Sequence, residues 1–228
     1  MTRLGSLVVT NERSFYFIVM SKGAATKDAI LEHAIRLAST VGLEGLTIGT
    51  LADALDLSKS GLFAHFRSKQ ALQVEILDRA AALFTEVVIR PALATPRGEA
   101  RLRALLERWL LWPREVPQPG GCLFVQAAVE LDDRPGPARD RLVELQREWL
   151  GTIARVARAA QAEGDIRRDA DPEQLAFEIH GIMLSFHHAT RLLRDRAAVE
   201  RARRAFDRLL DHVRASRALP RRPPPPDV

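Results

Sequence analysis

Cysteine is almost absent from this chain of 228 residues, because Cys122 is the only one. A lone thiol excludes an intramolecular disulfide and the metal sites that need paired cysteines. Long hydrophobic runs are absent as well. The longest run near the start, residues 15–20, is far shorter than the ~20 residues of a membrane span, and no cleavable export signal is evident. We therefore predict a cytoplasmic protein that binds neither membrane nor metal.

Strand-like alternation of apolar and polar residues is almost absent, and so are the short motifs of enzymes. The chain has no nucleophile elbow, no glycine loop that would cradle a phosphate, and no triad or paired carboxylates. We predict a protein that is not an enzyme and needs no cofactor. Apolar residues recur instead at helical spacing, which predicts an all-α fold with helices at 26–41, 74–90, 99–112, 121–131, 138–163, 172–194 and 196–213.

Positive charge is in excess, with a formal net charge of +5, but it is unevenly distributed. Residues 201–228 contain eight arginines and three aspartates, an excess of five that equals the whole net charge. The basic composition is therefore weak evidence that the rest of the chain binds nucleic acid. Any such function has to rest on the geometry of a motif.

The two ends of the chain lack helical periodicity. Residues 1–22 are predicted to form a disordered arm, or to be a mis-assigned start if translation begins at Met20. Residues 216–228 are rich in arginine and proline and have little to bury, which predicts a disordered tail.

The most informative stretch of the sequence is residues 47–66. Thr47 is a good N-cap for a short helix whose apolar residues Ile48, Leu51, Ala52 and Leu55 share one side. Asp56 follows at a turn that often needs a left-handed backbone, a conformation that Asp tolerates better than most residues. The pattern predicts a short helix that ends in a tight turn.

A second short helix follows, with Ser58 as its N-cap. Leu62 and Phe66 share the face that can pack on the first helix, and the outward-facing residues are Lys59, Ser60, Gly61 and Phe63. Two short helices with a tight turn and a small, polar outer face suit insertion into the major groove of DNA. The stretch is therefore interpreted as a helix-turn-helix.

At this point residues 24 to about 84 resemble the DNA-binding domain of the TetR (tetracycline repressor) family of regulators. The residues that carry the resemblance are Thr47-Ile48, Leu51-Ala52, Leu57-Ser58-Lys59, Leu62-Phe63, His65-Phe66, Ser68-Lys69 and Leu72. The resemblance implies a three-helix DNA-binding domain over 23–84, and DNA contacts by Thr47, Ser58, Lys59, Ser60, Gly61, Phe63, His65 and Lys69. Lys69 and the helix capped by Ser68 would hold phosphates.

Two residues depart from the family pattern: Asp56 stands where Gly is common, and Phe63 where a tyrosine hydroxyl usually reaches a phosphate. The second change implies weaker backbone anchoring with no loss of the fold. Two residues of the motif keep alternative interpretations. Gly61 is either required for close approach to a base pair or a neutral choice at an exposed position, and His65 either contacts a phosphate or packs beside the aromatic residues.

Beyond about residue 84 the resemblance continues as architecture. It implies a larger ligand-binding and dimerisation domain over 85–215, in which helices 138–163 and 172–194 form a four-helix bundle with their copies in a second subunit. Candidate ligand-binding residues are Trp109, Trp112, Phe124, Phe177, His180, Met183 and His187, each of which is otherwise a plain core residue. Cys122 is interpreted as a buried apolar residue, with a redox sensor as the alternative.

The resemblance thus implies a homodimeric transcriptional repressor that binds a palindromic operator in double-stranded DNA and is released by a small-molecule effector. The alternative is a helical protein-interaction or architectural protein without sequence-specific DNA binding. The two hypotheses differ in whether the outer face of residues 59–63 is bare or packed beneath other parts of the molecule.

Overall fold

Helices make up nearly all of residues 27–215, the part of the chain that the computed structural model describes, and this range has no β-strand beyond an isolated bridge between Ile166 and Arg214. The all-α prediction is confirmed. The predicted arm at 1–22 and tail at 216–228 lie outside the described residues. The elements are α1 Lys27–Gly45, α2 Ile48–Leu55, α3 Lys59–His65, α4 Lys69–Phe84, the π-helical turn η1 Thr85–Ile89, α5 Arg90–Leu93, α6 Glu99–Glu115, α7 Leu123–Leu131, α8 Pro137–Ala162, α9 Pro172–Arg191 and α10 Ala198–Val213.

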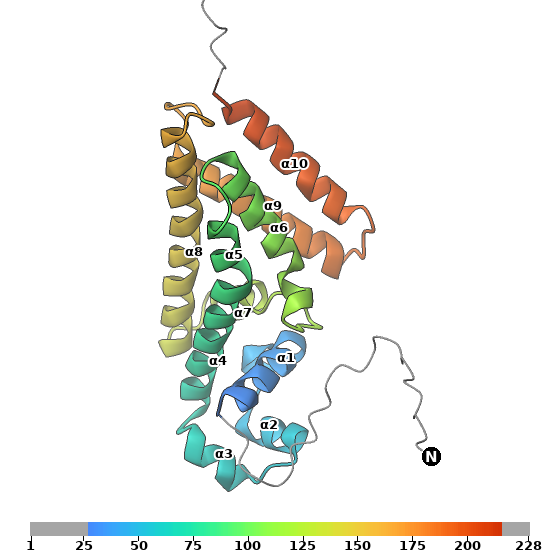
Figure 1. Ribbon diagram of the computed structural model, residues 1–228. Coiled ribbons are helices and arrows are strands. Elements are labelled where there is room, and N and C mark those ends of the chain that lie inside the picture. The colour runs from blue at the N-terminus through green and yellow to red at the C-terminus, as the bar shows by residue number, and fades with distance from the viewer. Residues whose placement is uncertain (1–26, 216–228) are drawn as a thin grey trace, which may run out of the picture.

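The helices form an elongated molecule with α2 and α3 at one end and α10 at the other (Figure 1). Helix α4 runs from the end that carries α3 towards the centre, where it packs against α8. Helix α1 packs on both α4 and α7, and α9 lies between α8 and α10 in the packing order. The small N-terminal group of helices is therefore joined to the larger C-terminal group through α4 and α7.

Two apolar clusters form the core. One contains the buried faces of α1 to α4, and it also takes in Leu123 and Ala127 of α7 and Leu142 of α8. The other lies among α6, α8, α9 and α10. Because the first cluster draws residues from α7 and α8, a change in the position of α7 reaches the packing of α1 directly.

Helix α4 continues without a break through η1 into α5. Pro91 has no backbone N–H, so the carbonyl of Val87 lacks its α-helical donor. In the π-helical turn just before this proline, the Arg90 N–H donates to the Thr85 carbonyl, five residues back, and not to the carbonyl four residues back as in an α-helix. The predicted domain boundary at 84/85 falls at this turn. Such turns occur preferentially where a helix is adapted to a site.

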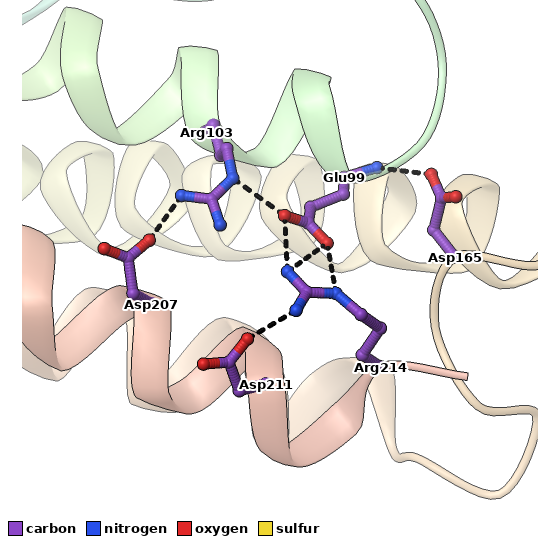
Figure 2. A network of polar contacts seen from close by, with 6 residues as sticks. All are labelled: Glu99, Arg103, Asp165, Asp207, Asp211 and Arg214. Carbon is purple, nitrogen blue, oxygen red and sulfur yellow. Dashed lines mark hydrogen bonds and ion pairs between the residues drawn. The ribbon is translucent and has the colours of Figure 1, made fainter. Parts of the chain in front are cut away.

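Within α10, Arg201, Arg203 and Arg204 form ion pairs, and Arg214 just after it does so too. Figure 2 shows Arg214 between Glu99 and Asp211, and Arg103 between Glu99 and Asp207. Asp165, in the loop before α9, accepts a hydrogen bond of 2.8 Å from the Glu99 backbone N–H at the start of α6. The network fastens α10 to α6, and it shows that much of the positive charge of this segment has carboxylate partners.

Candidate nucleic-acid interface and cavity

The turn between α2 and α3 has the predicted local geometry. The hydroxyl of Thr47 accepts a hydrogen bond from the Thr50 backbone N–H and the Thr50 hydroxyl accepts one from the Thr47 N–H, each 3.0 Å long, which makes a reciprocal cap. Asp56 ends α2 in the left-handed conformation, with φ 53° and ψ 39°. The helix-turn-helix is therefore confirmed as a local structure.

The outer face of α3 is bare. Lys59, Ser60, Gly61 and His65 are exposed, and the ring of Phe63 is 55 % exposed. Leu62 and Phe66 are fully buried in the core that α3 shares with α2. Phe63 belongs to neither of the two apolar clusters of the described residues.

The N-terminus of α3 is organised by Ser58, whose hydroxyl accepts a hydrogen bond of 3.1 Å from the Gly61 backbone N–H. A methyl group at Gly61 would lie 3.0 Å from that hydroxyl oxygen, tighter than a normal contact. A side chain at Gly61 therefore requires a small shift of the Ser58 hydroxyl. Ser68 caps α4 in the same way through the Ala71 N–H.

Four basic side chains lie on α3 or just after it: Lys59, His65, Arg67 and Lys69. The first three are exposed, and Arg67 was not among the predicted contacts although it stands between Phe66 and Ser68 in the motif. Lys69 is different because its ammonium donates to the Glu44 carbonyl at 2.6 Å and lies 3.3 Å from the Glu44 carboxylate. Two of its three N–H donors therefore have partners within the chain.

Glu44, at the end of α1, is the centre of a polar cluster that joins the two groups of helices. Its carboxylate also accepts hydrogen bonds from Gln73 at 2.8 Å and from Arg134, in the loop after α7, at 3.1 Å. The hydrogen bond from Gln73 and the interactions with Lys69 and Arg134 hold the pKa of the Glu44 carboxyl below its usual value, although partial burial opposes them. The Glu44 backbone N–H donates to Glu130 of α7 at 3.2 Å.

A second contact between the two groups involves Gly120, in the loop before α7. Its backbone N–H donates to the buried Ser39 hydroxyl of α1 at 3.2 Å. A side chain at Gly120 would overlap the Ser39 carbonyl, so the close approach of the two backbones requires glycine. Both ends of α7 are therefore tied to α1.

A cavity of about 220 Å³ lies among the C-terminal helices. Its walls come from α4 and η1, from α6, from the start of α7, and from α8 and α9. The lining residues are Ala81, Phe84, Thr85, Ile89, Trp109, Cys122, Phe124, Val125, Leu145, Gln146, Glu148, Trp149, Thr152, Arg155 and His180.

Of the predicted ligand-binding residues, the structure brings Trp109, Phe124 and His180 together in this cavity. The others are elsewhere. Trp112 is buried behind the wall, where its ring stacks on Phe124. Met183 is a fully buried core residue, His187 lies against Gly121, and Phe177 points outward with 71 % of its surface exposed. Trp149, Thr152 and Arg155 were missed, because on sequence they belong to an ordinary amphipathic helix.

Two titratable groups in the cavity are kept neutral by their surroundings. Burial raises the pKa of the Cys122 thiol, and burial lowers the pKa of the His180 imidazole. A raised thiol pKa opposes formation of the reactive thiolate, as expected for the apolar interpretation of Cys122. Within residues 27–215 no cluster of three or more His, Cys, Asp or Glu side chains is arranged to hold a metal ion, and none of the helices there has the length and apolar character of a membrane span.

Comparison with known proteins matches two family models to this chain. Residues 30–76 match the bacterial regulatory proteins of the tetR family, and residues 98–206 match the tetracycline repressor-like C-terminal domain. The first match contains the whole of α2 and α3. The second contains the helices around the cavity from α6 to α9.

Individual relatives agree with both models. The chain is 23 % identical over 153 residues to the HTH-type transcriptional repressor DhaR of Mycobacterium sp. (strain GP1), over 64 % of this chain and 75 % of that protein. It is 33 % identical over 81 residues to the class C tetracycline repressor protein of Escherichia coli, over 36 % of this chain and 34 % of that protein. The crystal structure of a TetR transcriptional regulator from Chloroflexus aurantiacus superimposes with a TM-score of 0.71 at 27 % identity, covering 82 % of this chain and 95 % of that one.

The bare outer face of α3, the capped turn that presents it, and the two family matches agree with one another. The chain belongs to the TetR family and is a DNA-binding transcriptional regulator.

Proposed function

We propose that the protein is a cytoplasmic repressor that binds a palindromic operator as a homodimer and leaves it when a small molecule enters the cavity. The observation that carries the proposal is the bare outer face of α3, on the side away from the buried Leu62 and Phe66. A helix-turn-helix reads base edges with this part of its second helix. The two relatives compared by sequence above, DhaR and the class C tetracycline repressor, are both named repressors, which supports repression as the mode of regulation.

In this proposal the residues of α3 divide into two groups. Ser60 and Gly61, at the exposed start of the helix, approach base edges, while Thr47, Ser58, Lys59, Phe63 and His65 lie against the backbone or the groove wall. Lys69 and the capped N-terminus of α4 hold a phosphate, to which the ammonium presents its third donor. Arg67 joins them as a further exposed cation.

The surface of α9 supports dimerisation. Phe177, Gly181, Leu184 and His188 are exposed and recur at the spacing of one helix face, and a side chain at Gly181 would meet nothing within 4 Å. An apolar strip of this kind on an outer helix fits a second copy of the chain. A dimer also supplies the two copies of α3 that a two-fold symmetric operator needs.

The ties between α7 and α1 supply a route from the cavity to the DNA. Cys122, Phe124 and Val125 of the cavity wall stand at the start of α7, and Glu130 at its end holds the backbone of Glu44. A ligand that displaces α7 alters the position of α1, and with it the partner of Lys69. Its differential affinity for the two arrangements sets how far DNA affinity falls.

The test is an electrophoretic shift assay with the DNA upstream of the protein's own coding region. We expect a specific complex. Lys69→Ala should weaken binding to all sequences by a similar factor and reduce the salt dependence, while Ser60→Ala and Gly61→Ser should change the preferred bases. Arg204→Ala, exposed on the distant α10, is the control and should change neither. Absence of any specific shift at modest salt would favour an architectural or protein-interaction role.

Dimerisation is tested separately by sedimentation. Phe177→Asp should convert the dimer to a monomer and abolish binding to the palindrome, because it places a charge in the apolar strip. The matched control is Val129→Asp, since Val129 is 74 % exposed on α7 outside the strip. A dimer that survives Phe177→Asp and Leu184→Asp together would show that α9 is not the interface.

A further inference from the structure

Four aromatic side chains contribute to the walls of the cavity. Phe84, Trp109, Phe124 and Trp149 all line it. Phe84 meets the Trp149 ring edge to face with centroids 4.9 Å apart, and the Phe124 ring in the same way at 5.9 Å. Walls of this kind accept a hydrocarbon or aromatic body and leave few positions for a polar group.

The polar groups of the cavity are concentrated on one strip of α8. Thr152 is nearly buried, and its hydroxyl accepts a hydrogen bond of 2.7 Å from the Arg155 guanidinium. Arg155 is thus held at the cavity by Thr152, which also lines it.

The two charged residues of this strip differ in their partners. Glu148 lies 3.8 Å from Arg141, and its side chain is 68 % exposed. Arg155 is exposed as well and lines the cavity, and it forms no ion pair with any residue of the range 27–215. The charge at the cavity that has no ion-pair partner there is therefore positive.

The wall also contains a buried donor. The indole N–H of Trp149 has no hydrogen-bond partner in the described part of the chain, and Trp149 itself is 93 % buried. Leaving such a group unpaired costs free energy. Because the indole nitrogen is covered, the exposed guanidinium of Arg155 is the donor on α8 that is open to an acceptor-rich head group.

We propose that the cavity binds an amphipathic carboxylic acid, with its hydrocarbon or aromatic body among Phe84, Trp109 and Trp149 and its carboxylate on the guanidinium of Arg155. A carboxylate matches both the charge and the planar geometry of guanidinium. Thr152 positions the guanidinium and does not itself carry charge. This inference rests on the proposed effector role of the cavity and names the chemical class that the role requires.

The experiment is calorimetric titration of the full-length dimer with three matched probes of each body: 3-phenylpropanoate and octanoate, their primary amides, and the corresponding trimethylammonium ions. We expect each carboxylate to bind at least about tenfold more tightly than its amide, since the amide cannot form a charge-assisted pair. The ammonium ions should bind more weakly than the amides.

Arg155→Gln should lower the affinity for each carboxylate to that of its amide and leave the amide unchanged. Arg155→Lys should retain part of the preference, because it keeps the charge without the fork. Arg147→Gln is the control, since Arg147 is exposed on the same helix as Arg155 is but does not line the cavity. Equal affinity for carboxylate and amide, preference for the cation, or a preference that survives Arg155→Gln would each overturn the inference.

Operator binding is measured on the same preparations without ligand. A protein that binds DNA but shows no preference for carboxylates overturns only the inference about ligand class. A protein that prefers carboxylates through Arg155 but binds no DNA supports that inference and contradicts the regulatory function.

Discussion

Replacement of Gly42 by alanine tests how α1 is joined to α7. Gly42 interrupts α1 with φ 81° and ψ 162°, a conformation that residues with a side chain rarely adopt. A methyl group there would overlap the Glu130 carboxylate, which holds the Glu44 backbone N–H at 3.2 Å. The substitution therefore strains the backbone and displaces the contact between the two groups of helices.

The two effects have separate magnitudes. A residue held in so sparsely populated a conformation costs on the order of 1–3 kcal/mol. Loss of a hydrogen bond to a charged group costs about 1.5–3 kcal/mol when buried, and less at a partly exposed residue such as Glu130. We expect Gly42→Ala to lower the free energy of unfolding by about 2–4 kcal/mol. In a Glu130→Ala background the overlap disappears, and the cost should fall to about 1–3 kcal/mol.

The assay is urea denaturation at one fixed protein concentration, because the stability of a dimer depends on concentration. Gly45→Ala is the matched control: its side chain would meet Val41 at an ordinary 3.5 Å, so stability should be unchanged or rise by up to about 1 kcal/mol. A loss below about 1 kcal/mol for Gly42→Ala, or equal losses with and without Glu130, would refute the reasoning.

Three further predictions concern single residues. Leu62→Ala should destabilise the protein by about 2–5 kcal/mol in urea denaturation because Leu62 is fully buried, whereas Phe63→Ala should leave stability within about 0.5 kcal/mol and weaken DNA binding. Equal losses of stability in the two variants would place Phe63 in the core. Measured by fluorescence anisotropy, Phe63→Tyr should tighten binding to specific and random DNA alike by about 0.5–1.5 kcal/mol, the contribution of one phosphate hydrogen bond. A gain limited to one sequence would contradict this. Burial lowers the pKa of His180 below 6.5, so as pH falls the unfolded chain takes up the imidazole proton before the folded chain does, and the contribution of neutral His180 to stability, complete above pH 6.5, is lost below it. His180→Gln should therefore flatten the fall of the urea midpoint between pH 7 and pH 5.

The parts of the fold that depend on local pattern were predictable. The amphipathic period predicted helices at 99–112 and 138–163, and the structure has them at Glu99–Glu115 and Pro137–Ala162. The left-handed turn at Asp56 and the caps at Thr47 and Ser58 followed from side-chain chemistry within a few residues, and all three are present. Such features are set by neighbours in the chain, so one sequence suffices to predict them.

The composition of the cavity was only partly predictable, because the helical period does not say which neighbour a face meets. Phe177 was predicted to bind the ligand because it is aromatic, yet it points outward. Trp149, in contrast, belongs to a buried stripe and lines the cavity. Arg155 resembled an ordinary solvated charge. Its significance depends on its lining the cavity without an ion-pair partner among residues 27–215, which spacing along one helix cannot reveal.

The cluster around Glu44 changes the interpretation of Lys69. Its partners Lys69 and Arg134 are 25 and 90 residues away along the chain, so no local pattern links them. The sequence predicted Lys69 as a phosphate contact, but in the structure its ammonium already holds the end of α1. A cation shared between a carboxylate and a phosphate binds DNA with an energy that depends on how firmly the carboxylate holds it. Because Arg134 and Glu130 position Glu44 from the C-terminal helices, the strength of this DNA contact is set in part by residues that never approach the duplex.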